Sequence, residues 1–185
     1  ALSSGTLEIL GKAKELGTEF ELITIGPDDA PSIGIDSINQ KYVKRNAENL
    51  QFNNIATIIS EYIKDNEVKL VLSSSTYVCR DIISFISVDL LSSPVSNVID
   101  FSISNGSVET INSINGGESI YKSKVNSEHA LLLIRPKAFE PIEAEFNDNY
   151  DTLEVEDSNI PIFDIFKEEK EGPQLEDSKI VISAG

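Results

Sequence analysis

The stretch Val68-Lys69-Leu70-Val71-Leu72-Ser73-Ser74-Ser75-Thr76, followed by an apolar stretch over Tyr77–Leu91, decides the fold. A short apolar run broken only by Lys69 is typical of a parallel strand that is buried on both faces. The second stretch predicts a strongly apolar helix that Pro94 closes. A strand that passes through a hydroxyl-rich loop into a helix is typical of β/α alternation. We therefore expect a parallel sheet with helices on its faces.

The remaining elements extend this pattern. Helices are expected over residues 4–16 and from a cap at Asn53 or Asn54 to about Lys64. The alternation of residues predicts strands, which are Phe20–Ile25, a short one around Tyr42-Val43, Val95–Ser104, Ser107–Ile114, Ser119–Val125, Ala130–Ile134, Tyr150–Val155 and Lys179–Ser183. Asn105-Gly106 between two of them indicates a hairpin. The fold class is therefore α/β, a mostly parallel sheet flanked by helices with an antiparallel hairpin portion.

Composition limits the class of protein. The 185 residues, 40% of them hydrophobic, suit one domain or one domain with an extension, and no apolar run approaches the ~20 residues of a membrane span. No signal peptide is recognisable, and a single cysteine, Cys79, favours a reducing compartment. The sequence contains no Met, and its first helix begins almost at once, which favours a processed, trimmed or incompletely represented chain.

Negative charge is concentrated near the C-terminus. Residues 143–177 hold thirteen acidic residues against two lysines, a net charge of −11 out of the chain's −16. Such a surface repels phosphate backbones and anionic lipid, so nucleic acid and membrane insertion are excluded as expectations. The acidic segment is either a solvated flank or a docking surface for a basic partner. We interpret residues 143–178 as a connector packed on the preceding domain.

The best candidate for a ligand site is the loop after the buried strand, since ligands of open α/β sheets bind at the carboxyl ends of strands. Ser74, Ser75 and Thr76, with Arg80 one helical turn further on, could hold an anion. The alternative is a serine-rich helix cap. The loop has no glycine that would let a phosphate approach the backbone, and no nucleotide-binding motif.

Other reactive residue types give no active site. His129 is the only histidine and is expected to be a polar turn residue, while Cys79 on the apolar helix is expected to be a buried structural thiol. The paired acidic residues match no calcium loop. We therefore expect no catalytic residue and no metal site.

The run Ile134-Arg135-Pro136-Lys137-Ala138-Phe139-Glu140-Pro141 follows no periodic pattern, and it resembles the end of the first domain of the electron transfer flavoprotein alpha subunit. Other segments resemble that subunit in the same order. These are the helix Leu2–Leu16 without its preceding strand, Ser73–Ile83 with Arg80 and Asp81, Ile114–Gly117 with Tyr121, and Lys179–Gly185. Two glycines of the family's loop are replaced, by Ser73 or Ser74 and by Cys79, as in a degenerate nucleotide loop.

The resemblance implies an adenine-nucleotide hydrolase-like fold that has lost its nucleotide. Residues 1–142 would be domain I of an alpha subunit, and residues 179–185 would start the strand that leads to an absent FAD-binding domain. FAD would be bound by that absent domain and AMP by a beta-type partner, with no cofactor on this chain. The implied role is not enzymatic. It is a scaffold paired with the beta-type subunit, in a carrier fed by acyl-CoA or other flavoprotein dehydrogenases in the cytoplasm or the mitochondrial matrix.

Two other interpretations stay open. The chain could be a stand-alone paralogue that binds AMP or ATP through the Ser73–Arg80 loop, or an enzyme that uses its acidic residues with a metal. The sequence does not identify the dehydrogenase, the electron acceptor or the oligomeric state, or whether electron bifurcation is involved.

Overall fold

The computed structural model describes residues 2–27, 32–46, 51–158, 160–164 and 180–182. Three helices are present in these ranges, α1 (Ser4–Leu16), α2 (Phe52–Asp65) and α3 (Tyr77–Asp89). Ser3 caps α1 by accepting a hydrogen bond from the Thr6 amide, and Gly17 ends that helix with φ of 66°. The predicted asparagine cap of α2 is wrong, because the residue before the helix is Gln51, two residues earlier than Asn53.

The central sheet has five strands in the order β4 (Leu70–Ser74), β8 (Ala130–Ile134), β5 (Pro94–Ser104), β6 (Ser107–Ile114) and β7 (Ser119–Val125). The first three strands run parallel, and β5, β6 and β7 form the predicted antiparallel portion. The β5–β6 turn is made by Asn105 and Gly106, both with positive φ, which is the geometry that an Asn-Gly hairpin requires. The predicted α/β fold class is confirmed.

A second parallel sheet contains β1 (Glu21–Pro27), β3 (Asn39–Arg45) and β10 (Asp151–Leu153) in the order β1-β3-β10. The short strand expected around Tyr42-Val43 is thus a full strand. A two-stranded sheet pairs β2 (Gly34–Ile35) with β9 (Phe146–Asn147), and η1 (Asn115–Gly117) joins β6 to β7. The sequence predicts one parallel sheet, but the parallel strands divide into two sheets between β1 and β4.

The described part of the acidic segment is joined to the body of the domain. Strands β9 and β10 both belong to the acidic segment and pair with strands of the domain. The buried side chain of Gln51 donates from its Nε2 to the Glu156 carbonyl and to Asp157 Oδ1, at 3.2 Å each. Ile180–Ile182, the described part of the predicted strand at Lys179–Ser183, form no strand and are exposed. The rest of that prediction lies outside the described residues.

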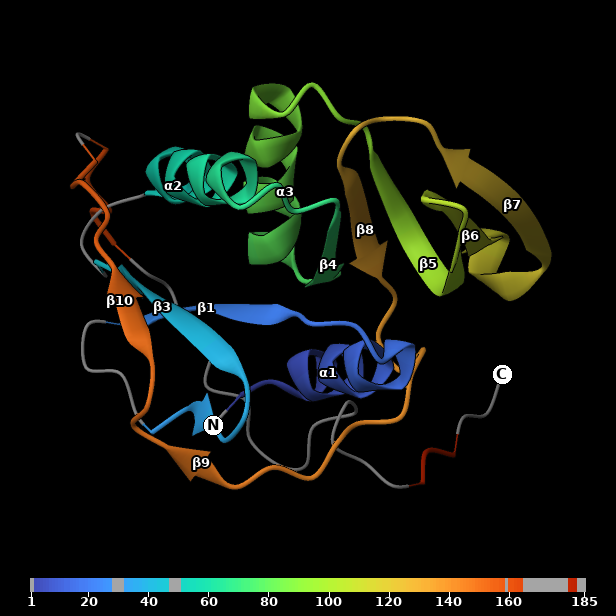
Figure 1. The fold of residues 1–185 in the computed structure, drawn as a ribbon, viewed down its shortest axis with the longest axis horizontal. Helices are drawn as coiled ribbons and strands as arrows, with labels where there is room; N and C mark the ends of the chain where they lie inside the picture. Colours follow the sequence, from blue (N-terminus) through green and yellow to red (C-terminus); the bar gives the residue numbers. More distant parts are fainter. Residues whose placement is uncertain (1, 28–31, 47–50, 159, 165–179, 183–185) are drawn as a thin grey trace.

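The core lies in layers on either side of the strands (Figure 1). Helices α2 and α3 cover one side, where they pack on Val43, Leu131 and Leu133. Helix α1 lies on the other side, where Leu10 packs with Ile35 and Ile38. A third cluster, built around Val98, Phe101 and Leu132, fills the space between the five-stranded sheet and the C-terminal half of α1.

Candidate functional site

The loop after β4 brings together all four residues that the sequence analysis singled out there. The Ser75 amide donates to the Ile134 carbonyl at 3.1 Å, and Arg80 Nε donates to Ser75 Oγ at 3.0 Å. Thr76 caps α3 by accepting from the Cys79 amide at 3.2 Å. These contacts occupy the hydroxyl of Thr76 and the guanidinium Nε of Arg80 within the loop itself. The arrangement is that of a serine-rich helix cap.

The first turn of α1 lies against this loop. A Cβ atom at Gly5 would be 3.2 Å from Ser74 Cβ, so the helix N-terminus and the carboxyl end of β4 are in close contact. The N-termini of α1 and α3 therefore meet at Ser74, which concentrates partial positive charge there. Ser3 and Thr76 already cap the two helices. Anion binding by Ser74, Ser75, Thr76 and Arg80 stays a prediction.

The Arg135–Pro141 run crosses α1 and holds it on the body of the domain. The Lys137 amide donates to Glu8 Oε2 at 2.7 Å, and Glu8 is only 6% exposed. The Ile142 amide, just beyond the run, donates to the Leu7 carbonyl at 3.2 Å. Between these contacts the Glu140 carbonyl lies so close to Gly11 that a Cβ there would be 2.2 Å from its oxygen. The run is therefore a clasp over α1, a role that sequence reasoning missed.

Aromatic side chains pack against the clasp and hold it on the domain. Phe139 and Phe101 meet edge to face with ring centroids 6.2 Å apart, and Lys12 Nζ lies 5.2 Å from the centroid of the Phe139 ring. Lys12 also approaches Asp100 at 3.3 Å. Arg135 donates its amide to the Val98 carbonyl and its Nη1 to Ser113 Oγ, at 2.9 and 3.1 Å. Most of these contacts are packing and anchoring contacts, while Arg135 and Ser113 also line a small pocket of about 220 Å³ beside Asn115 and Gly116.

His129 lies in the turn before β8, as expected, whereas the expectation that Cys79 is buried needs correction. His129 is buried, and its Nδ1 donates to the Val68 carbonyl at 2.7 Å, so it anchors the start of β4. Cys79 is half-buried, with its Sγ 3.6 Å from Ser74 Oγ. Within the described ranges, no three His, Cys, Asp or Glu side chains gather in a way that could hold a metal ion. None of the described helices is long and apolar enough to cross a membrane.

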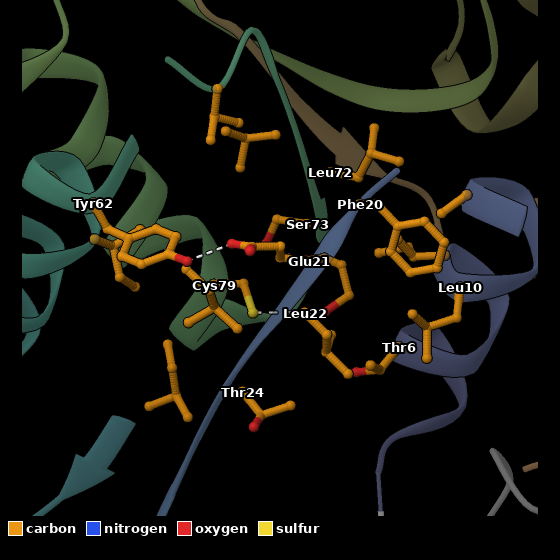
Figure 2. Close-up of a pocket in the computed structure, with 18 of the residues that line it drawn as sticks. Thr6, Leu10, Phe20, Glu21, Leu22, Thr24, Tyr62, Leu72, Ser73 and Cys79 are labelled. Atoms are coloured by element: carbon orange, nitrogen blue, oxygen red, sulfur yellow. Dashed lines mark hydrogen bonds between the residues drawn. The ribbon is translucent and has the colours of Figure 1, made fainter. Parts of the chain in front are cut away.

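A large cleft separates β1 from β4 (Figure 2). Its volume is about 1500 Å³, and it is lined by side chains of all three helices as well as both strands. Figure 2 shows Thr6 and Leu10 of α1 on one side and Tyr62 of α2 and Cys79 of α3 on the other. The lining is predominantly apolar, and its polar groups include the hydrogen-bonded pair Tyr62 and Glu21 and the hydroxyls of Ser73 and Thr76.

The hydroxyl of Tyr62, at this cleft, is expected to ionise at a higher pH than a free tyrosine. Its hydroxyl donates to Glu21 Oε2. Burial, this hydrogen bond and the negative charges of Glu21 and Asp151 raise the pKa of Tyr62 from 10.0 to about 12. Because the folded value is the higher one, the stabilisation is complete below pH 10 and is lost as the pH rises towards 12. Absorbance at 295 nm of the wild type minus Tyr62→Phe gives this titration.

The matched variant Glu21→Gln removes the charge and leaves an amide acceptor. It should move the Tyr62 midpoint back towards 10, because both the coulombic repulsion and the charged acceptor are lost. A titration midpoint of Tyr62 near pH 10 in the wild type would contradict the hydrogen bond between Tyr62 and Glu21.

A family model described as "Electron transfer flavoprotein domain" matches residues 1–158. No curated protein matches the chain. The matched range contains the clasp, the Ser73–Arg80 loop and every helix and strand of the described fold.

Proposed function

The chain belongs to the electron transfer flavoprotein domain family, and we propose that it is the N-terminal domain of an alpha-type subunit. In this role it pairs with a beta-type subunit and helps to form the carrier that accepts electrons from flavoprotein dehydrogenases. The family consists of electron carriers. The alpha assignment is supported by the Arg135–Pro141 run and by the order in which the other resembling segments follow one another along the chain.

The exposed face of α3 is the observation that carries this proposal. Tyr77 and Val88, which are 86% and 70% exposed, lie on the side of the helix that points away from Ile82, Ile83 and Ile86 in the core. Phe85 lies between them at 47% exposure, and Leu91 follows the helix at 91%. Large apolar side chains exposed on one side of a helix, here interspersed with the exposed Asp81 and Ser84, are common on a surface that another protein covers. We assign the α3 stripe, Tyr77, Phe85, Val88 and Leu91, to the beta-type subunit.

Features of the loop after β4 support an assignment of the AMP phosphate to another chain. The loop after β4 has no glycine, Ser74 fills the space beside Gly5, and Arg80 is engaged by Ser75. A phosphate needs free amides and room for close approach to the backbone. We propose accordingly that FAD is bound by a further domain and AMP by the beta-type subunit. The cytoplasm or the mitochondrial matrix, where acyl-CoA and other flavoprotein dehydrogenases act, is the proposed location.

Calorimetry tests the proposal against the nucleotide-binding alternative. Titration of the chain with a beta-type subunit from the same source should release or absorb heat with a one-to-one endpoint. Titration with AMP or ATP should give no binding at micromolar concentration, because the loop has no glycine that would let a phosphate approach the backbone. Micromolar nucleotide binding that Arg80→Ala abolishes, without binding of the beta-type subunit, would instead identify a stand-alone nucleotide sensor.

A further inference from the structure

A small pocket opens at the carboxyl end of β8, beside the turn that joins β6 to β7. Its volume is about 220 Å³, which is below the roughly 300–1,000 Å³ of typical ligand pockets. The pocket therefore has room for one small chemical group and not for a nucleotide. Its lining includes Asn97, Ser113, Asn115, Gly116, Gly117 and Arg135, and we call it the Arg135 pocket.

The main chain of β5 and β8 sets the position of this pocket. The Arg135 amide donates to the Val98 carbonyl at 2.9 Å, so Arg135 continues the pairing of β8 with β5. The register of β5 shifts just before this point, between Val95 and Val98, and Asn97 within the shift has φ of 53°. Such bulges re-aim side chains and are common next to functional sites. The carboxyl ends of strands are also where open α/β sheets usually bind their ligands.

The Arg135 pocket presents hydrogen-bond donors that have no acceptor within the described part of the chain. Arg135 Nη1 donates to Ser113 Oγ at 3.1 Å, and Ser113 is only 6% exposed. Because Ser113 Oγ accepts this bond, its own proton remains to be donated, and none of the described residues accepts it. The other N–H groups of the guanidinium are likewise without an acceptor in the described ranges.

The positive charge of Arg135 is also uncompensated. The chain has 31 acidic residues against 15 basic ones, yet no acidic residue lines the pocket. None of the described Asp or Glu side chains forms an ion pair with Arg135. An arginine that is held by a buried hydroxyl and keeps its remaining donors unused is complementary to an anion.

The turn between β6 and β7 leaves open space beside these donors. A Cβ atom at Gly117 would lie 3.9 Å from Ser113 Oγ, and a Cβ atom at Gly116 would meet no atom within 4 Å. Asn115 precedes these glycines with φ of 52°, a conformation that non-glycine residues rarely adopt. Residues held in such conformations cluster at ligand sites. The turn thus keeps a polar hollow open next to the guanidinium.

We propose that the Arg135 pocket binds one carboxylate group. A guanidinium and a carboxylate are both planar and form paired hydrogen bonds, and one positive charge balances one negative charge. The Ser113 hydroxyl supplies a further donor, and the small volume limits the ligand to one such group. The carboxylate belongs either to a small organic acid or to an Asp or Glu side chain of the beta-type subunit. The second source rests on the function proposed above.

Nuclear magnetic resonance of the arginine side chains tests the proposal directly, because the chain has only three arginines, Arg45, Arg80 and Arg135. Sodium acetate is titrated into the isotope-labelled chain, with sodium chloride keeping the ionic strength constant. We expect the Arg135 Nε–H signal and the Gly116 and Gly117 amide signals to shift and to saturate at millimolar acetate, while the Arg45 signal stays in place. Equal shifts of all three arginines without saturation would overturn the proposal, because they would report only a diffuse ion atmosphere. Inorganic phosphate that binds more than about tenfold tighter than acetate would overturn it in favour of a phosphate site.

Asn115→Asp and Asn105→Asp form a matched pair of variants. Both asparagines precede a glycine in a turn and have nearly the same φ, 52° and 50°, but only Asn115 lines the pocket. Aspartate tolerates this conformation as asparagine does, and each change adds one negative charge. Asn115→Asp should raise the half-saturating acetate concentration at least about tenfold, because its own carboxylate competes for the donors. Asn105→Asp should change that concentration less than about twofold. Equal effects of the two variants would contradict a site at Arg135, since the response would then follow net charge.

The beta-type subunit distinguishes the two sources of the carboxylate. If one of its side chains fills the pocket, a stoichiometric amount of the subunit shifts the Arg135 signal, and saturating acetate weakens the association at least about threefold. If the subunit binds and leaves the Arg135 signal free to respond to acetate, the pocket takes a small organic acid. Failure of the subunit to bind would count against the proposed function alone, because the acetate titration uses only this chain.

Discussion

Gly11→Ala is expected to destabilise the domain by about 2–3 kcal/mol, although the same change in an exposed helix would stabilise it by about 1 kcal/mol. The reason is the clasp formed by Arg135–Pro141. A methyl group at position 11 would lie 2.2 Å from the Glu140 carbonyl oxygen, and a backbone oxygen cannot rotate away as a side chain can. The Tm, measured by circular dichroism, should fall by about 5–10 °C.

Gly5→Ala is the matched control on the same helix. Its new methyl group would meet Ser74 Cβ at 3.2 Å, a contact that a small shift relieves. The Tm should therefore stay within about 2 °C of the wild type. If the Tm of Gly11→Ala equals that of Gly5→Ala, the gain in helix propensity outweighs the steric contact with Glu140. The clasp would then not restrict the side chain at position 11.

The sequence predicts those parts of the fold whose local pattern and burial agree. The unit formed by β4 and α3 is recognisable because an apolar run leads through a hydroxyl-rich loop into a helix that places Ile82, Ile83 and Ile86 in the core. The expectation that β4 is buried on both faces is wrong, since all five of its residues are half-buried. The hairpin at Asn105-Gly106 is recognisable because few residues other than Asn and Gly adopt positive φ readily. In both cases the conformation of the backbone is determined by a few residues that are adjacent in the sequence.

Long-range partners could not be predicted in this way. Nothing in the periodicity of residues 20–25 states that β1 pairs with β3 and leaves its other edge open, since pairing depends on segments far apart in the chain. Glu8 is an acidic residue on a helix and would ordinarily be assigned to solvent, yet it accepts the Lys137 amide in the core. One signal was available for the clasp. Gly11 inside a helical pattern often marks a close packing contact.

Val88→Lys is expected to weaken binding of the beta-type subunit at least about 30-fold, a loss of about 2 kcal/mol. The prediction rests on the proposed assignment of the α3 stripe, in which Val88 is 70% exposed in the isolated chain and is buried by the partner. An ammonium group in an apolar interface loses its hydration without gaining a counter-ion. Isothermal titration calorimetry of the variant against the beta-type subunit measures the effect.

The folded state of the chain alone should tolerate this substitution. Lysine is a good helix former, and a positive charge near the C-terminal end of α3 interacts favourably with the helix dipole, so the Tm should not fall by more than about 2 °C. Ile120→Lys, at a 64% exposed position on the edge strand β7, is the matched control and should bind as the wild type does. If Ile120→Lys weakens binding while Val88→Lys does not, the beta-type subunit covers the β6–β7 hairpin and α3 faces solvent. An equal loss for both variants would mean that added positive charge, rather than the α3 stripe, governs the association.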